Sequence, residues 1–302
     1  MMEAVFDRYR EIIPEFPAFQ DALKRPIPTH LRVNRLKIRP QTLSDILRQK
    51  GVEVRKVTEL DESLLWAPGL EKPGNLLEYY LGFFHPQALT SCLVSLALPV
   101  EPYSFAIDLC ASPGGKTSHM AQIMNNTGLL IANELRPQRH IALASNLARL
   151  GVFNSVITGY QAQEFPLRQR FDFVLADVPC SGEGRFRLSN GLPGRKHKDV
   201  WSGQQGLQKR IILRAFDLLK ERGEMIYSTC TYNPEENESV VDFLLKNREA
   251  VLIPIKSWFK AEPGILMWKG ECYDRQIQRA IRYYPHRVDS VGFFMARIGR
   301  GK

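Results

Sequence analysis

The chain has 302 residues, of which 44% are hydrophobic and 24% charged, a composition typical of a globular protein rather than a disordered one. Its formal net charge of +9 favours an anionic partner such as a nucleic acid. Five cysteines, an odd number without any C-x-x-C pair, disfavour both a disulfide framework and a zinc ribbon, and we expect no metal site.

The first hundred residues predict a small basic α+β domain. Residues 1–25 indicate one or two helices, and HLRVNRLKI (30–38) alternates like a strand. TLSDILRQKG (42–51) is typical of a short helix closed by glycine, and VEVRKV (52–57) alternates again. This β-α-β unit is similar to an RNA-recognition module that lacks the aromatic strand motif. Residues 60–100 run through Pro68, Pro73 and Pro86 into HPQALTSCLVSLAL (85–98), where a helical connector is expected.

The N-terminal part also bears on the compartment of the protein. Its longest apolar stretch, CLVSLALPV near residue 92, is too short to cross a bilayer. The first sixteen residues are acidic and amphipathic, unlike a secretory signal. We therefore expect a cytoplasmic protein with no membrane partner, and a monomer.

Basic residues are concentrated in two windows. Residues 24–56 hold ten basic and two acidic residues, a net charge of +8. A second cluster lies in GRFRLSNGLPGRKHKDVW (184–201), where glycine and proline predict a loop. Two such clusters favour contact with a polyphosphate backbone. The basic residues are Lys24, Arg25, Arg32, Arg35, Lys37, Arg39, Arg48, Lys50, Arg55 and Lys56 in the first window, and Arg185, Arg187, Arg195, Lys196 and Lys198 in the second.

From residue 104 onward, short apolar runs alternate with helical stretches. The strands are expected in FAIDLC (105–110), LLIANE (129–134), SVITGY (155–160), FDFVLADV (171–178) and EMIYSTCT (224–231). Helices are expected in 117–124, 136–151 and 204–223, and two edge strands in VLIPI (251–255) and VGFFMARI (291–298). This order predicts an α/β fold with a Rossmann-like, mostly parallel sheet flanked by helices over residues 101–302. The smaller α+β domain occupies residues 1–100.

The stretch DLCASPGGKT (108–117) follows the first of these strands and ends like a nucleotide-triphosphate P-loop. However, Cys110 stands where the P-loop needs its first glycine, and Pro113 removes a backbone N–H donor. These two departures disfavour a triphosphate site. Small residues before a helix, followed by Glu134 at the end of the second strand, instead indicate a nucleoside cofactor whose ribose hydroxyls the carboxylate binds.

Two thiols follow the fourth and fifth strands. Cys180 comes after Asp177 in DVPCSGEG, and Cys230 lies in STCTYNPEENE. Because strand ends of a parallel sheet meet at one crevice, both sulfurs are expected beside the carboxylate. Asn233 and Glu236 predict a capped helix directly afterwards, whose N-terminus would lower the pKa of Cys230. A lone cysteine is usually a small, buried apolar residue. Two cysteines at strand ends flanked by polar residues instead favour a catalytic role for the thiols.

These motifs, in this order and spacing, resemble those of the Sun/RsmB-type RNA cytosine-C5 methyltransferases. LGFFHPQ (81–87) and PHRVDSVGFFMARI (285–298) resemble that family as well, and the likeness spans about residues 25–300. The resemblance implies an S-adenosylmethionine-dependent enzyme that methylates carbon 5 of a cytosine in structured ribosomal or transfer RNA.

The resemblance also implies residue roles. Cys230 would attack the base and Cys180 would assist release, although the residues alone leave the choice between the thiols open. Asp177 would contact the cytosine edge, and Lys116 would stabilise developing charge. Gln161 stands where the family has an aspartate directed at adenine, and its amide oxygen can still accept that hydrogen bond. The implied cofactor residues are Cys110, Ala111, Ser112, Pro113, Gly114, Gly115, Lys116, Glu134, Arg139, Gln161 and Asp177.

Two other functions remain as alternatives. A non-catalytic RNA-binding protein could retain the cofactor pocket, but every reactive position is intact in this sequence. A small-molecule methyltransferase would not need the basic window 24–56. His30, His85 and His286 are expected to be structural because none follows a predicted strand.

Overall fold

The structure is a computed structural model that describes residues 6–58, 61–187 and 197–301, with the backbone alone described for 197–203. It contains two sheets that organise separate hydrophobic cores, together with a two-stranded hairpin. None of the helices in the described part of the chain is both long and apolar enough to span a bilayer.

The smaller sheet has four short antiparallel strands in the order β2-β3-β1-β4. Leu31 of the central strand pairs with Leu65, and both lie in a buried apolar cluster with Phe84. The strands are β1 (His30–Val33), β2 (Arg55–Lys56), β3 (Leu64–Trp66) and β4 (Phe84–Pro86), and the helices are α2 (Pro40–Gln49) and α3 (Leu77–Tyr80). The helix predicted in HPQALTSCLVSLAL is present as α4 (Leu89–Ala97), whereas β3 and β4, which also lie between residues 60 and 100, were not predicted. These three-residue strands form through pairing with distant β1, which local periodicity does not show.

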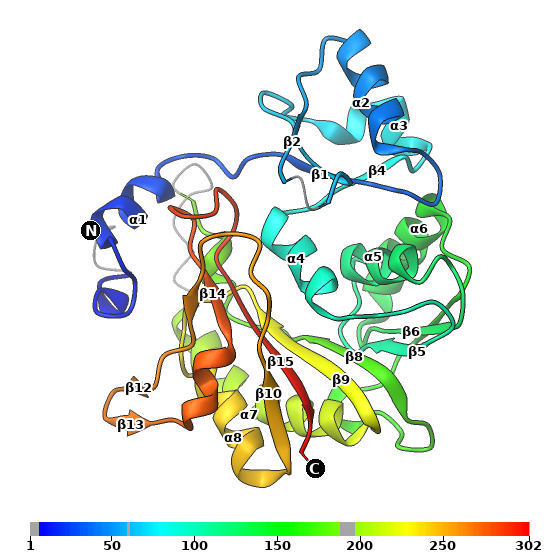
Figure 1. Cartoon of the computed structure of the whole chain (residues 1–302). Coiled ribbons are helices and arrows are strands. Elements are labelled where there is room, and N and C mark those ends of the chain that lie inside the picture. Colours follow the sequence, from blue (N-terminus) through cyan, green and yellow to red (C-terminus); the bar gives the residue numbers. More distant parts are fainter. Residues whose placement is uncertain (1–5, 59–60, 188–196, 302) are drawn as a thin grey trace.

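The first residues pack on the large domain instead of on the small sheet. A 3-10 turn (Asp7–Tyr9) and α1 (Phe16–Leu23) place Phe6, Tyr9 and Phe19 against Tyr232 and Tyr284. Figure 1 shows α1 beside the C-terminal strands, away from β1. The boundary between residues 1–100 and 101–302 stays a prediction.

The large sheet confirms the predicted Rossmann-like core. Nine strands form it in the order β11-β14-β15-β9-β8-β5-β6-β7, with β10 paired to β15, and β5 to β9 run parallel. The parallel strands are β5 (Phe105–Asp108), β6 (Leu129–Asn133), β7 (Ser155–Thr158), β8 (Phe171–Asp177) and β9 (Leu219–Thr229). The antiparallel ones are β10 (Ala250–Ile253), β11 (Glu262–Pro263), β14 (Ile281–Tyr283) and β15 (Phe293–Arg300), and the hairpin is β12 (Met267–Trp268) with β13 (Glu271–Cys272).

Helices cover both faces of this sheet (Figure 1). Ala106 and Ile226 pack with α4 and α5, whereas Ile107 and Val174 on the opposite face pack with α7 and α8. This alternation explains why the parallel strands are apolar along their whole length. The helices are α4 (Leu89–Ala97), α5 (Gly115–Ile123), α6 (Pro137–Leu150), α7 (His197–Asp217) and α8 (Glu238–Asn247).

The stretch VGFFMARI forms a strand as predicted, but its predicted position at an edge of the sheet is wrong. VGFFMARI forms β15, which pairs with β9 on one side and with β14 and β10 on the other. Its residues Phe293, Phe294, Met295 and Ala296 are all buried. Such a continuous apolar run belongs to a strand covered on both faces, and neighbours on both sides keep its backbone groups paired.

Candidate active site

Two thiols lie in contact at the carboxyl ends of adjacent parallel strands. Cys180 follows β8 and Cys230 follows β9, and their Sγ atoms are 3.5 Å apart. The amide of Gly184 donates a 2.8 Å hydrogen bond to the carbonyl of Cys230, which fixes one cysteine loop against the other. A side chain at Gly184 would collide with the Gly292 carbonyl, so this close approach requires glycine. The structure therefore brings together the two thiols that the sequence singled out.

The two sulfurs are electrostatically different. A hydrogen bond from the Cys180 thiol, helped by the charges of Lys116 and Arg185 and opposed by burial, lowers the pKa of Cys230 below its ordinary value. The same hydrogen bond, together with burial, raises the pKa of Cys180 well above that value. Cys180 thus holds its proton as the donor, and Cys230 is the sulfur more easily converted to a thiolate.

The helix predicted to begin behind Cys230 starts later than expected. Residues 234–237 form a turn, and α8 begins at Glu238 with Asn237 as the N-cap. The Asn233 side chain accepts a 3.1 Å hydrogen bond from the amide of Glu235, as in an Asx turn. Glu236 does not complete a capping box, because its carboxylate accepts hydrogen bonds from the Ser181 amide and Gln208, each 2.9 Å long. The lowered pKa of Cys230 thus comes from its side-chain neighbours.

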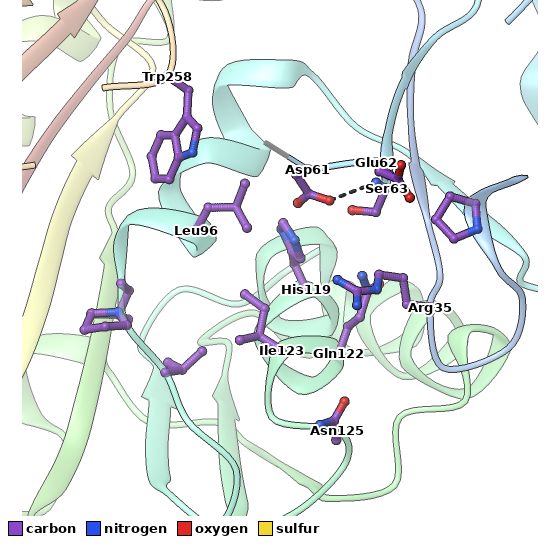
Figure 2. Close-up of a pocket in the computed structure, with 14 residues that line it drawn as sticks. Arg35, Asp61, Glu62, Ser63, Leu96, His119, Gln122, Ile123, Asn125 and Trp258 are labelled. Atoms are coloured by element: carbon purple, nitrogen blue, oxygen red, sulfur yellow. Dashed lines mark hydrogen bonds between the residues drawn. The ribbon is translucent and has the colours of Figure 1, made fainter. Parts of the chain in front are cut away.

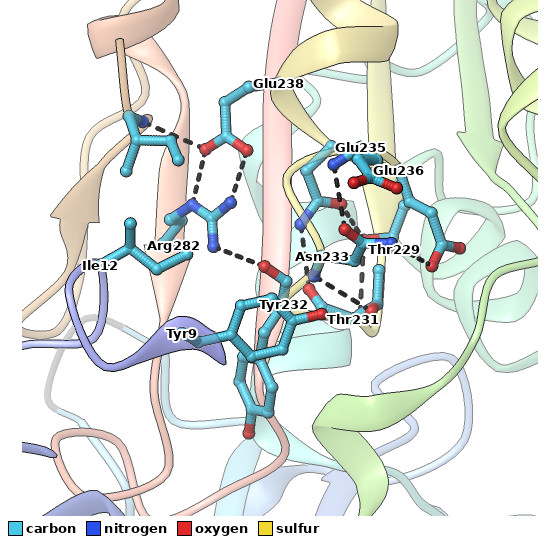
Figure 3. Close-up of polar contacts among 12 residues, drawn as sticks. Tyr9, Ile12, Thr229, Thr231, Tyr232, Asn233, Glu235, Glu236, Glu238 and Arg282 are labelled. Atoms are coloured by element: carbon cyan, nitrogen blue, oxygen red, sulfur yellow. Dashed lines mark hydrogen bonds and ion pairs between the residues drawn. The ribbon is translucent and has the colours of Figure 1, made fainter. Parts of the chain in front are cut away.

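Buried polar contacts hold this turn in place (Figure 3). Thr229 donates to the Asn237 side chain at 2.5 Å, and Asn237 in turn donates to the Thr231 carbonyl at 3.0 Å. At the start of α8, the carboxylate of Glu238 forms a fully buried ion pair with the guanidinium of Arg282, with an N–O distance of 2.5 Å. The backbone on both sides of Cys230 is therefore anchored, as a reactive thiol requires.

A lysine and an aspartate form an ion pair beside the thiols. Lys116 Nζ lies 2.7 Å from Asp177 Oδ2, and the other carboxylate oxygen accepts a 2.9 Å hydrogen bond from Ser228. Burial would lower the pKa of Lys116, but the charge and hydrogen bond of Asp177 raise it above its ordinary value. Lys116 is therefore a cation at neutral pH, next to the sulfur of Cys230.

The loop from β5 to α5 is shaped by a buried carboxyl group. Asp108 accepts hydrogen bonds from Thr117 at 2.7 Å and from the amide of Cys110 at 3.2 Å. Burial raises the pKa of Asp108 to about 6. Gly114 has a φ of 100°, which only glycine adopts without strain, and α5 begins at the next residue. The backbone between Asp108 and Gly114 thus makes a tight turn, and this turn borders a cavity.

This cavity has a volume of about 490 Å³. Both thiols, Lys116 and Asp177 face it, and so does the whole turn 110–113 with Gly115 and Arg139. The cavity therefore collects the strand-end residues predicted from the sequence. In the part of the chain that the structure describes, no group of three or more His, Cys, Asp or Glu side chains could hold a metal ion.

Three of the predicted cofactor residues, Gly114, Glu134 and Gln161, lie outside this lining. The carboxylate of Glu134 forms a 3.0 Å ion pair with Arg139 and also accepts from the Arg136 amide at 2.9 Å. Gln161 is exposed, and its side chain is hydrogen-bonded to Glu164 and Gln163. Their roles stay predictions, since carboxylate and amide oxygens can accept further hydrogen bonds.

His85 lines the cavity although the sequence indicated a structural role. Its ring is buried on β4, and Nδ1 lies 3.1 Å from a guanidinium nitrogen of Arg149. Burial, reinforced by the charges of Arg32 and Arg149, lowers the pKa of His85 to about 3, so the ring is neutral at physiological pH. The LGFFHPQ motif was the only signal for it in the sequence.

The structure shows that not all basic residues of the two windows are available to bind a phosphate backbone. Arg32 is buried and donates to Gln87, Gln122 and Ser118, and Arg187 is buried with a 2.5 Å hydrogen bond to the Ser290 carbonyl. Neither guanidinium is available to bind a phosphate, because each is buried and donates its hydrogen bonds to groups inside the protein. Arg25, Arg35, Arg39 and Arg185 are exposed, while Arg195 and Lys196 lie outside the described residues, as does the side chain of Lys198.

Comparisons with known proteins agree on one family. The family model for 16S rRNA methyltransferase RsmB/F matches residues 95–299. The chain is 33% identical to a tRNA (cytosine(49)-C(5))-methyltransferase of Pyrococcus abyssi, over 97% of this chain and 94% of that protein. It is 34% identical to a 28S rRNA (cytosine-C(5))-methyltransferase of Mus musculus, over 97% of this chain but only 38% of the relative's length. A crystal structure of a methyltransferase homologue from Pyrococcus horikoshii superposes with a TM-score of 0.83 at 32% identity, covering 98% of this chain and 94% of that one.

Proposed function

The chain belongs to the RsmB/F family of 16S rRNA methyltransferases, and from this membership we propose that it transfers a methyl group from S-adenosylmethionine to carbon 5 of a cytosine in RNA. The observation that carries the proposal is the contact between Cys230 and Cys180, 3.5 Å apart in one cavity with Lys116 and Asp177. A nucleophilic thiol with a second thiol beside it suits the formation and release of a covalent base adduct.

The residues around the cavity fit the proposed cofactor. S-adenosylmethionine supplies an electrophilic methyl group on a positively charged sulfur when it is bound. The carboxyl groups of Asp108 and Asp177 favour a positive charge there, and the narrow turn 110–116 allows close backbone contact. Glu134 would hold the ribose and Arg139 would orient Glu134 through their ion pair. A volume of about 490 Å³ lies within the usual range of ligand sites, ~300–1,000 Å³.

In the proposed reaction, the Cys230 thiolate adds to carbon 6 of the cytosine ring. The new S–C6 bond pushes electron density onto carbon 5 and toward N3, so carbon 5 becomes nucleophilic. Lys116 stabilises the negative charge that develops on the ring, and Asp177 contacts the polar edge of the base. Carbon 5 would then form a bond to the methyl carbon that S-adenosylmethionine supplies, while the S–CH3 bond would break and its electrons would stay on the sulfur, so that S-adenosylhomocysteine is the leaving group.

Release restores the aromatic ring. The proton on carbon 5 leaves as a base removes it, the electrons of that C–H bond re-form the C5–C6 double bond, and the S–C6 bond breaks. Cys180 assists this step from its place beside the sulfur of Cys230. Because a target base must leave its stack to enter the cavity, we propose a base-flipping enzyme or one that binds an unpaired cytosine.

The substrate class is structured RNA. Relatives of this chain carry names that specify ribosomal RNA and transfer RNA, so both belong to the proposal. The alternative, a non-catalytic RNA-binding protein, does not require a thiol pair or the ion pair of Lys116 with Asp177.

The test is methylation itself. Purified protein, S-adenosylmethionine and total RNA from cells that lack the gene should yield 5-methylcytosine at a discrete site, mapped by bisulfite sequencing. Protein with Cys230→Ala should leave that site unmodified. No conversion-resistant cytosine in any RNA treated with the wild-type protein would refute the proposal.

A further inference from the structure

A second cavity, of about 700 Å³, lies apart from the thiols. The two cavities share no lining residue, but α5 contributes to both: Gly115 and Lys116 face the thiols, whereas His119, Gln122 and Ile123 face the second cavity. Figure 2 shows this cavity between the small domain, which supplies Arg35, Asp61, Glu62 and Ser63, and two separate parts of the chain: α4, which carries Leu96, and the loop after β10, which carries Trp258.

Two polar atoms at this cavity are buried without a partner. His119 and Ser63 are each 1% exposed, and the His119 Nδ1 and Ser63 Oγ atoms make no hydrogen bond within the described residues. A buried polar atom without a partner costs free energy, roughly 1–3 kcal/mol, unless a ligand satisfies it. Burial, followed by the charge of Arg32, lowers the pKa of His119 well below its ordinary value, so the ring is neutral and can both donate and accept.

Asp61 offers an acceptor for paired N–H donors. One of its carboxylate oxygens accepts a 2.8 Å hydrogen bond from the Ser63 amide, and no other hydrogen bond to this carboxylate occurs within the described residues, although the backbone carbonyl of Asp61 accepts one from the Leu64 amide at 3.2 Å. A carboxylate has about four acceptor positions, so most of its capacity is open. Glu62, beside it, is already paired with Lys56 at 2.9 Å. The cavity therefore presents one carboxylate that a ligand can use.

Two further residues that line the cavity, Trp258 and Arg35, could bind an aromatic ring and a phosphate group. The half-buried indole of Trp258 lies near Leu96 on one side of the cavity (Figure 2). Arg35 lies on the other side and is exposed; within the described residues it makes no hydrogen bond or salt bridge, and its charge adds to the hydrogen bond and charge of Lys56 in lowering the pKa of Glu62. An aromatic face binds nucleobases by stacking, and an unpaired guanidinium binds phosphate.

We propose that this cavity binds a guanine nucleotide, with the base beside Trp258, its paired N–H groups on Asp61 and its phosphate on Arg35. Guanine is the base whose Watson–Crick edge carries two adjacent donors, N1–H and the N2 amine, which match the two oxygens of a carboxylate. Adenine and cytosine place an acceptor next to their amine, and that acceptor would face the negative charge. The nucleotide has two possible sources: a guanosine of the substrate RNA, or a free guanine nucleotide. The first of these rests on the proposed function.

Binding is tested first without any methylation. Ligand-observed NMR titrations of the wild-type protein should detect 5′-GMP more strongly than 5′-AMP or 5′-CMP. Asp61→Asn should weaken GMP binding at least about tenfold, because it replaces an acceptor oxygen by a donor. Trp258→Leu should weaken all three nucleotides. Asp45→Asn, an exposed carboxylate on α2 paired with Arg48, is the matched control.

Absence of GMP binding, or equal binding by wild type, Asp61→Asn and Trp258→Leu, would overturn the inference. A second measurement separates the two sources. If the nucleotide belongs to the RNA, Asp61→Asn raises the KM for RNA at least about fivefold with little change in kcat; if it is free, the KM stays unchanged while GMP binding is lost. Failure of the wild-type protein to methylate any RNA would defeat the proposed function and leave the GMP result standing.

Discussion

The sulfurs of Cys180 and Cys230 lie 3.5 Å apart, although fifty positions separate the two residues along the chain. Two loops after neighbouring strands create this contact, and it makes the thiols unequal: the pKa of Cys230 is lowered and that of Cys180 raised. Our first two predictions follow from this inequality.

Substituting each thiol should have opposite effects on a covalent intermediate. Cys180→Ala should accumulate a bond between protein and RNA, because attack by Cys230 remains possible while release is slowed. Cys230→Ala should form none. Denaturing gels of protein incubated with S-adenosylmethionine and labelled RNA will show the adduct as a slower band. Cys272→Ala, at an exposed position, is the control and should behave as wild type. An adduct that persists in Cys230→Ala would assign the attack to another residue.

Alkylation of Cys230 should depend on pH in a way that Cys180 controls. The thiolate is the reactive form, so the alkylation rate of Cys230 by iodoacetamide rises as pH passes its pKa. That midpoint should lie below the ordinary thiol value of about 8.5 in the wild type. In Cys180→Ala the stabilising hydrogen bond is gone, and the midpoint should move upward. Peptide mass spectrometry across a pH series measures it; an unchanged or lower midpoint would contradict the assigned hydrogen bond.

Removing the charge of Asp177 should impair turnover more than folding. Asp177→Asn leaves Lys116 without its ion-pair partner and removes a carboxylate from the cavity, so we expect kcat to fall roughly 10²-fold or more. Asp172→Asn is the matched control, because Asp172 lies on the same strand and pairs with Lys220 at the surface. Initial rates of methyl transfer with both variants decide the matter. Equal rates for Asp177→Asn and wild type would exclude Asp177 from the reaction.

The buried pair of Glu238 and Arg282 should dominate local stability. Glu238→Ala leaves a guanidinium that is 2% exposed without its counter-charge, a loss that typically costs about 3–5 kcal/mol. The free energy of unfolding, from urea titration followed by circular dichroism, should fall by that amount. Asp21→Ala breaks the exposed pair with Lys24 and should cost less than about 1 kcal/mol. Similar losses for both variants would refute the distinction.

Basic residues of the first window should separate into two groups. Arg32→Ala removes three buried side-chain contacts and should lower the melting temperature by several degrees, as expected for the loss of roughly 1–3 kcal/mol. Arg39 is exposed, so Arg39→Ala should leave the melting temperature unchanged. It should weaken RNA binding, and the slope of the binding constant against salt concentration should fall by the equivalent of about one phosphate contact. Calorimetry and filter binding over a salt series measure both; unchanged RNA binding by Arg39→Ala would remove it from the interface.

Local sequence patterns predicted the catalytic core well. The apolar runs of β5 to β9 and the positions of Asp108, Asp177, Cys180 and Cys230 at strand ends are readable because periodicity and turn residues act over short distances. Parallel topology then brings the strand ends to one edge, so the thiol cavity follows from order alone. The short strands β3 and β4 escaped prediction, since they depend on pairing with β1.

The order of the elements, the family resemblance and the reactive groups that share one edge of the sheet can all be read from the amino-acid sequence. The folded arrangement was needed to show that the two sulfurs are in contact with the pKa of Cys230 lowered and that of Cys180 raised, that Arg32 and Arg187 are buried, and that β15 lies inside the sheet. The physical reason is that hydrogen-bond direction, burial and ion pairing arise between residues far apart in the chain. Composition counts an arginine as a surface charge, whereas packing determines whether solvent or RNA can reach it.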